Sequence, residues 1–133
     1  MTADDEFLRA FFSGTLPNAG FHHRDHLRLA WLVVRRDGAE AGEQAVADGI
    51  RRFAAAHGHA ERYHETLTRF WVRLIAHVAR ASATADEGFD ALLAAHPRLL
   101  DAELPLRHWS REALFGSAAR AAWSPPDLVP LPF

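Results

Sequence analysis

Histidines are the residues of this chain whose type and spacing most clearly suggest chemistry. Three of them, at positions 22, 23 and 26, fall within the stretch Phe21–Trp31. A second cluster lies between residues 57 and 66, where three more histidines stand close to Glu65. Neutral imidazole is the commonest protein ligand for zinc, copper, iron and nickel, and it titrates near neutral pH. The two clusters predict a functional site, provided that the fold brings them together.

A metal site is the first prediction from this spacing. His22 and His26 are four residues apart, so on one helix their side chains project side by side and can hold one ion. His64 would complete three ligands for a divalent Zn, Fe, Cu or Ni ion. Glu65 or Tyr63 would be a fourth ligand, and Glu65 is also the predicted catalytic acid or base. An open coordination position would admit water or a small-molecule substrate.

A metal-free pocket for a small organic molecule is the alternative prediction. Its expected ligand-binding residues are His23, Tyr63, Thr68 and Trp71. Histidines and Glu65 would supply hydrogen bonds or proton transfer, and the tyrosine and tryptophan rings would form its walls. A third function, that of an accessory or interaction module without catalysis, also stays open. The proline-rich tail and the alanine-rich last helix would then form a docking surface.

Each histidine also has a structural explanation. His22 can be the N-cap of a helix whose third residue is Asp25. His57 and His96 stand at predicted helix C-termini, where the helix dipole favours an imidazolium. His64 lies beside an apolar stripe and can be a hydrogen-bonded core residue. A histidine pair four residues apart is common by chance, so these structural roles stay open beside the functional ones.

Composition limits the class of protein. The 133 residues, 49% of them hydrophobic, are enough for one domain over residues 1–133 with a hydrophobic core. All 15 basic residues are scattered arginines and the net charge is −2, so we expect no nucleic-acid binding. There is no cysteine, which excludes disulfides and thiolate sites. The polar N-terminus and short apolar runs predict a cytoplasmic protein without a membrane segment, as a monomer or homodimer.

Hydrophobic periodicity predicts an all-α fold, an antiparallel helical bundle of five to six helices joined by short connections. The predicted helices cover residues 4–13, 22–36, 39–57, 61–81, a segment from a capping box at Thr84–Glu87 to about His96, and 111–123. Residues 124–133 contain four prolines and are expected to pack on the bundle as an extended tail. In this topology eight of the nine histidines would gather at one end, with only His77 elsewhere.

Two stretches resemble the signature sequences of a known family. Phe21–Trp31 contains the pattern F-x-H-R-x-H, and Tyr63–Thr68 begins with Y-H-E-T. Both are similar to stretches in a family of small bacterial all-helical proteins without an assigned function. Residues 109–123 and the Pro-Asp tail after them are similar as well, so the resemblance covers nearly the whole chain. It implies a helical fold but no activity, cofactor or catalytic residue.

Overall fold

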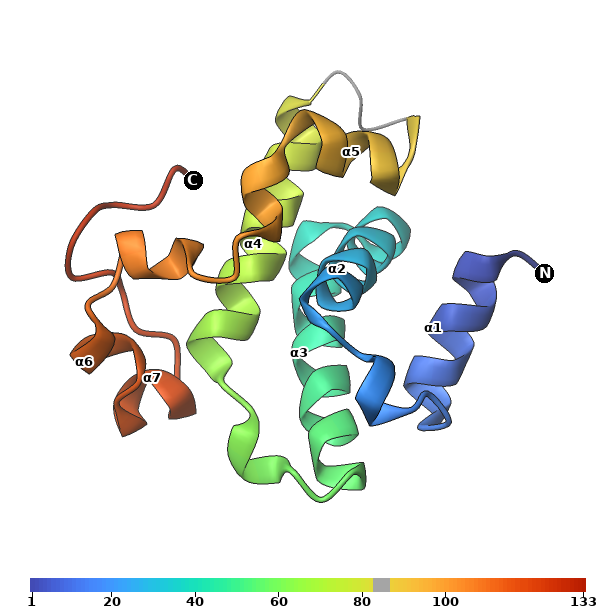
Figure 1. The fold of residues 1–133 in the computed structure, drawn as a ribbon, viewed down its shortest axis with the longest axis horizontal. Coiled ribbons are helices and arrows are strands. Elements are labelled where there is room, and N and C mark those ends of the chain that lie inside the picture. The colour runs from blue at the N-terminus through green and yellow to red at the C-terminus, as the bar shows by residue number, and fades with distance from the viewer. Residues whose placement is uncertain (83–86) are drawn as a thin grey trace.

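The computed structural model describes residues 1–82 and 87–133, and helices are the only regular elements in these two ranges (Figure 1). The α-helices are α1 (Ala3–Ser13), α2 (His23–Asp37), α3 (Ala39–Ala56), α4 (Glu65–Ala81), α5 (Phe89–Ala95), α6 (Arg111–Leu114) and α7 (Ser117–Ala121). Short 3-10 helices are η1 (Asn18–Gly20), η2 (Ala60–Arg62), η4 (Pro97–Leu100) and η5 (Leu104–Arg107). The predicted all-α class is confirmed.

Local signals explain where most helices begin and end. The α1 helix begins at a capping box, in which Thr2 Oγ1 accepts a hydrogen bond from Asp5 N at 3.1 Å and Asp5 Oδ2 accepts one from Thr2 N at 3.1 Å. Gly38 separates α2 from α3 and has a φ of 90°, a backbone angle that residues other than glycine rarely adopt. Thr84, Ala85 and Asp86, most of the capping box predicted for α5, lie outside the described residues.

Two predicted helices are shorter than their sequence patterns indicate. The helix expected over residues 61–81 begins at Glu65, because residues 60–62 form the separate η2 turn and His64 caps α4. The helix expected over residues 111–123 is divided into α6 and α7. Gly116 separates them in an extended conformation, with ψ at 162°. The hydrophobic periodicity of the sequence continues through both interruptions, so it does not reveal them.

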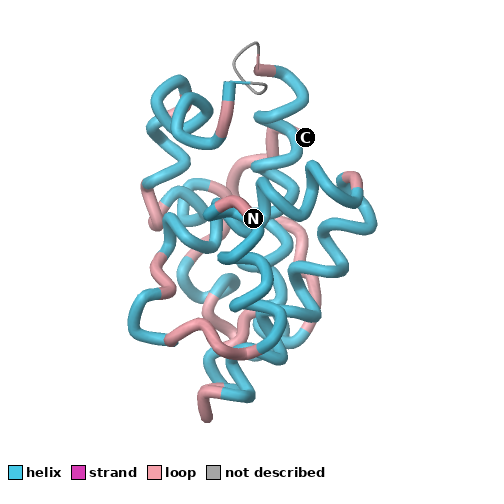
Figure 2. Tube along the Cα trace, turned by 90° about the vertical axis from the view of Figure 1, so that its right-hand side faces the viewer, coloured by secondary structure: helices cyan, strands magenta, loops and turns pink. Residues whose placement is uncertain are grey.

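The three longest helices, α2, α3 and α4, pack against one another at the centre of the molecule (Figure 1). The α1 helix lies beside α3, and on the opposite side of the molecule α7 packs against α4, with α6 next to α7 (Figure 1). Figure 2 shows the same helices, in cyan, after a turn of 90°. Two glycines allow close helix packing. A Cβ on Gly42 would lie 2.9 Å from Val34 Cα, and one on Gly49 would lie 2.8 Å from Phe11 Cε2.

This arrangement separates histidines that were expected to meet. His96 lines a hollow with Leu74 and Val78, which follow His64 by ten and fourteen residues. At 1.5 Å per helical residue, this places His96 roughly 15–20 Å along α4 from His64. His108 Nδ1 lies 2.8 Å from the Val129 carbonyl oxygen and so holds the C-terminal segment. The predicted gathering of eight histidines at one end does not hold for His96.

Within the two described ranges, no helix has both the length and the apolar character needed to cross a bilayer.

Candidate functional site

Two adjoining cavities lie where α2, α3, α4 and η2 meet. The first has a volume of about 310 Å³ and is lined by His23, Thr68 and Trp71, with apolar side chains from all three long helices. The second has a volume of about 190 Å³ and is lined by residues that include Asn18, His59, Arg62, Tyr63 and His64. Both cavities are also lined by His26, Ile50 and Thr68, so they meet at these three residues.

His26 is one of two polar side chains, with Thr68, at the junction of the two cavities. Its ring packs on the Phe21 ring with 4.2 Å between centroids, and it forms no hydrogen bond with residues 1–82 or 87–133. Burial lowers the pKa of His26 to about 4, and the neighbouring His23 adds to this effect while Asp25 opposes it. The imidazole is therefore neutral at physiological pH, and none of the described residues uses its hydrogen-bonding capacity.

His23, at the start of α2, is fixed by two contacts. Its Nε2 lies 2.9 Å from the Leu99 carbonyl oxygen, which can only accept, so Nε2 carries the proton. Its ring meets the Trp71 ring edge to face, with 4.5 Å between centroids. In the neutral ring, Nδ1 then keeps a lone pair that can accept a hydrogen bond. His23 and Trp71 together form a rigid wall of the larger cavity.

His64 has a structural role in this protein. It is the N-cap of α4, where Nδ1 accepts a hydrogen bond from Leu67 N at 3.1 Å. Its Nε2 must then carry the proton, and it donates to the Leu114 carbonyl oxygen at 2.6 Å. Burial is the main cause that lowers the pKa of His64 below its ordinary value. Both ring nitrogens are used, so neither has a lone pair left for a metal ion.

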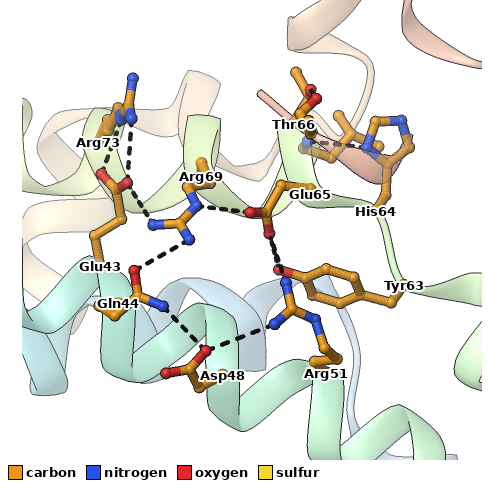
Figure 3. Close-up of polar contacts among 12 residues, drawn as sticks. Glu43, Gln44, Asp48, Arg51, Tyr63, His64, Glu65, Thr66, Arg69 and Arg73 are labelled. Carbon is orange, nitrogen blue, oxygen red and sulfur yellow. Dashed lines mark hydrogen bonds and ion pairs between the residues drawn. The ribbon is translucent and has the colours of Figure 1, made fainter. Parts of the chain in front are cut away.

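The Glu65 side chain points from α4 toward Tyr63 and toward Arg51 of α3 (Figure 3). It accepts hydrogen bonds from the Tyr63 hydroxyl, from Arg51 at 3.2 Å and from Arg69 at 3.2 Å. Burial raises the pKa of the Tyr63 phenol above its ordinary value, and the hydrogen bond to Glu65 raises it further. Glu65 is not among the side chains that line either cavity. A carboxylate held by two guanidinium groups is poorly placed to act as the predicted acid or base.

Not all predicted site residues come together. His23, His26, Thr68 and Trp71 line the larger cavity, and the smaller one brings Tyr63 and His64 to His26. His22 is exposed at the N-cap of α2, where its backbone N–H donates to Asp25. Across residues 1–82 and 87–133, no group of three or more histidine or acidic side chains is placed to hold a metal ion. His22, His26 and His64 therefore do not form the three-ligand group predicted from the sequence.

Residues from α3 and η2 complete the site and were not predicted as part of it. Ile50 belongs to the apolar face of α3, together with Val46 and Phe53. That pattern is typical of core packing and carries no signal for a cavity. Arg62 and Asn18 stand in short 3-10 helices, which have no periodicity to indicate where their side chains lie.

A larger hollow lies elsewhere and is a weaker candidate. It has a volume of about 1050 Å³ and runs between the first turns of α3 and the later turns of α4. Its central charges neutralise one another, because Glu43 pairs with Arg69 at 2.9 Å and with Arg73 at 2.8 Å (Figure 3). Burial opposes but does not cancel the effect of these two arginines, and the pKa of Glu43 lies below its ordinary value. These side chains stabilise the α3–α4 contact and leave little polar capacity for a ligand.

The Thr66 side chain points in a different direction from that of Glu65 (Figure 3) and holds the C-terminal segment. Its side chain is fully buried; Oγ1 donates to the Ala122 carbonyl oxygen at 3.0 Å and accepts from Ser124 N at 3.1 Å. His64 and Thr66 thus face the C-terminal segment, while Tyr63 and Glu65 face α3. This alternation accounts for the Y-H-E-T stretch in structural terms.

Thr66→Val tests this role. The valine keeps the shape but leaves the Ala122 carbonyl and the Ser124 N–H without partners, which costs about 2 kcal/mol of unfolding free energy. Thr66→Ser keeps the hydroxyl and is the matched control, with a loss of less than about 1 kcal/mol from the missing methyl group. Urea unfolding at pH 7.5 measures both. Equal stabilities of the two variants would contradict this role.

No protein-family model, curated protein or solved structure matches this chain. The structure defines an all-helical protein in which a histidine-lined cavity opens between three packed helices.

Proposed function

We propose that this protein binds a small organic molecule, without a metal ion, in the cavity lined by His23, His26, Thr68 and Trp71. The observation that carries the proposal is the His26 ring, which lines both cavities and has no hydrogen-bond partner among the described residues. The ring is only partly buried, and its nitrogens remain open to a ligand that places a hydrogen-bonding group against them. A cavity of about 310 Å³ with few polar groups on apolar walls is typical of small-molecule sites.

The donor geometry favours binding over metal or proton-transfer chemistry. No metal is part of the proposal, because His64 uses both nitrogens within the protein and His22 is not a lining residue of either cavity. A general base works best when its pKa lies near the working pH. The pKa of His26, about 4, makes it a weak base but a good neutral hydrogen-bonding group.

Two expectations from the sequence remain part of this proposal. We propose a cytoplasmic location, which the cysteine-free composition supports. We also propose that the protein works as a monomer or homodimer. The cavity is formed within a single chain and does not require residues of a second one.

Titration with two uncharged probes, indole and benzimidazole, tests the proposal. Both fit a cavity of this size, and benzimidazole has both a donor and an acceptor nitrogen. We expect dissociation constants below about 1 mM, with NMR shift changes at the Trp71 indole N–H and the Thr68 amide. His26→Leu should weaken benzimidazole binding about tenfold, since one buried hydrogen bond is lost.

The control is His77→Gln, a change on α4 beside Phe133 and outside both cavities. It should bind both probes as the wild type does. If neither probe shifts the Trp71 and Thr68 signals at several millimolar, the cavity is not a binding site and the proposal fails.

A further inference from the structure

We infer that the ligand of the joined cavities has an apolar body in the larger cavity and a carboxylate at the end that reaches the smaller one, beside Arg62. This inference rests on the proposed function and names the chemical class of the ligand. It follows from the different side chains that line the two cavities.

The larger cavity is suited to an uncharged, apolar group. Apart from His23, His26 and Thr68, its lining consists of Trp71 and aliphatic side chains. No arginine, aspartate or glutamate lines it, and His26 is neutral at physiological pH. Burying a charge here would carry a large desolvation penalty, so the charged end of a ligand has to lie elsewhere.

The smaller cavity has the opposite character. Its polar lining includes Asn18, His59 and Tyr63, and Arg62 adds a permanent positive charge. No aspartate or glutamate lines it, although Glu61, next in the chain to Arg62, lies 4.0 Å from His59 Nδ1. A hollow with a positive side chain and no carboxylate attracts anions.

Arg62 itself is available to an anion. Its exposed side chain forms no hydrogen bond or ion pair with residues 1–82 or 87–133. Nearby arginines are engaged, since Arg51 pairs with Glu65 and Arg120 donates to backbone carbonyls of residues 61–63. A guanidinium presents several N–H donors in a plane and matches the two oxygens of a carboxylate.

His26, Ile50 and Thr68 line both cavities, so the two cavities are neighbours, and the inference requires that one molecule reach from one to the other past these residues. A linker of suitable length is then required between the apolar body and the acid. The inference therefore has a second consequence: the affinity of the ligand should depend on the length of its linker.

Isothermal titration calorimetry with two matched series tests the inference. The acids are phenylacetate, 3-phenylpropionate and 4-phenylbutyrate, and their primary amides have nearly the same shape without the charge. At pH 7.5 and low salt we expect the best acid to bind about fivefold more tightly than its amide, the size of effect that a partly exposed ion pair gives. We expect affinity to change with linker length in both series.

Three variants test whether Arg62 causes the preference for acids over amides. Arg62→Gln should abolish the preference for acid over amide, and Arg62→Lys should keep part of it. Arg52→Gln removes an exposed arginine of α3 that lines a different hollow, beside Phe12 and Gly14, and should change nothing.

The possible failures are distinguishable. Amides that bind as tightly as acids, or an acid preference that persists in Arg62→Gln, would overturn the inference and leave the proposed binding site standing. If no acid and no amide binds while indole or benzimidazole does, only the inference fails; if indole and benzimidazole do not bind either, the proposed function fails as well.

Discussion

Lowering the pH from 7.5 to 4.5 is expected to reduce the unfolding free energy of the wild-type protein by about 2.5 kcal/mol more than that of His26→Leu. In the folded protein the pKa of His26 is about 4, below the value of 6.5 expected in the unfolded chain. Between these two values the unfolded chain binds more protons, so stability falls as the pH falls. Above pH 6.5 both states are neutral, and the full contribution is present.

Urea unfolding at pH 4.5, 5.5, 6.5 and 7.5 measures this difference. At pH 7.5 His26→Leu should be at least as stable as the wild type, because leucine removes a polar group that has no partner among the described residues. His64, whose pKa is also lowered, is present in both proteins and makes both lose stability in acid. His77→Gln controls for the loss of one histidine. Parallel pH profiles of the wild type and His26→Leu would show that the His26 ring is not desolvated.

Trp109→Ala is expected to lower the unfolding free energy by about 4 kcal/mol, the largest effect of a single substitution that we predict. The Trp109 side chain is fully buried, and its ring meets the rings of Phe70 at 5.5 Å and Trp123 at 5.8 Å. Its Nε1 donates to the Ser124 carbonyl oxygen at 3.0 Å. Alanine therefore removes both core volume and a link to the C-terminal segment.

Trp109→Phe separates these two contributions. Phenylalanine keeps most of the ring packing but cannot donate to Ser124, so we expect a loss of about 1–2 kcal/mol. Thermal and urea unfolding measure the stability of both variants. Limited proteolysis should cut the segment after residue 122 faster in Trp109→Ala than in the wild type. Equal losses from the two substitutions would mean that the hydrogen bond, and not the ring, dominates.

The sequence predicted features that depend on neighbours along one helix. Four residues quoted as possible site residues, His23, His26, Thr68 and Trp71, do line one cavity, because helical spacing places each pair on a common face. The helices α1 (Ala3–Ser13), α2 (His23–Asp37) and α3 (Ala39–Ala56) follow from the same periodicity and from local caps. These are short-range properties, and they can be deduced from spacing.

Contacts between distant residues decided the remaining roles. The His64 ring meets the carbonyl of Leu114, fifty positions later, and Glu65 meets Arg51 on another helix. Spacing within the Y-H-E-T stretch contains no information on either partner. The predicted metal ligands are not placed together among the described residues. The prediction took His64 as a free ligand, whereas the fold uses both of its ring nitrogens for hydrogen bonds with the main chain.

Gly42 and Gly49 limit how this protein can be made more heat-resistant by engineering. In an ordinary helix, replacing an interior glycine by alanine adds about 1 kcal/mol of stability. Here the new methyl group at position 42 would press on the main chain of Val34, and that at position 49 on the Phe11 ring, which is stacked on Phe53. Close interlocking of neighbouring helices therefore outweighs intrinsic helix preference, and attempts to rigidify α3 have to use its solvent-facing positions.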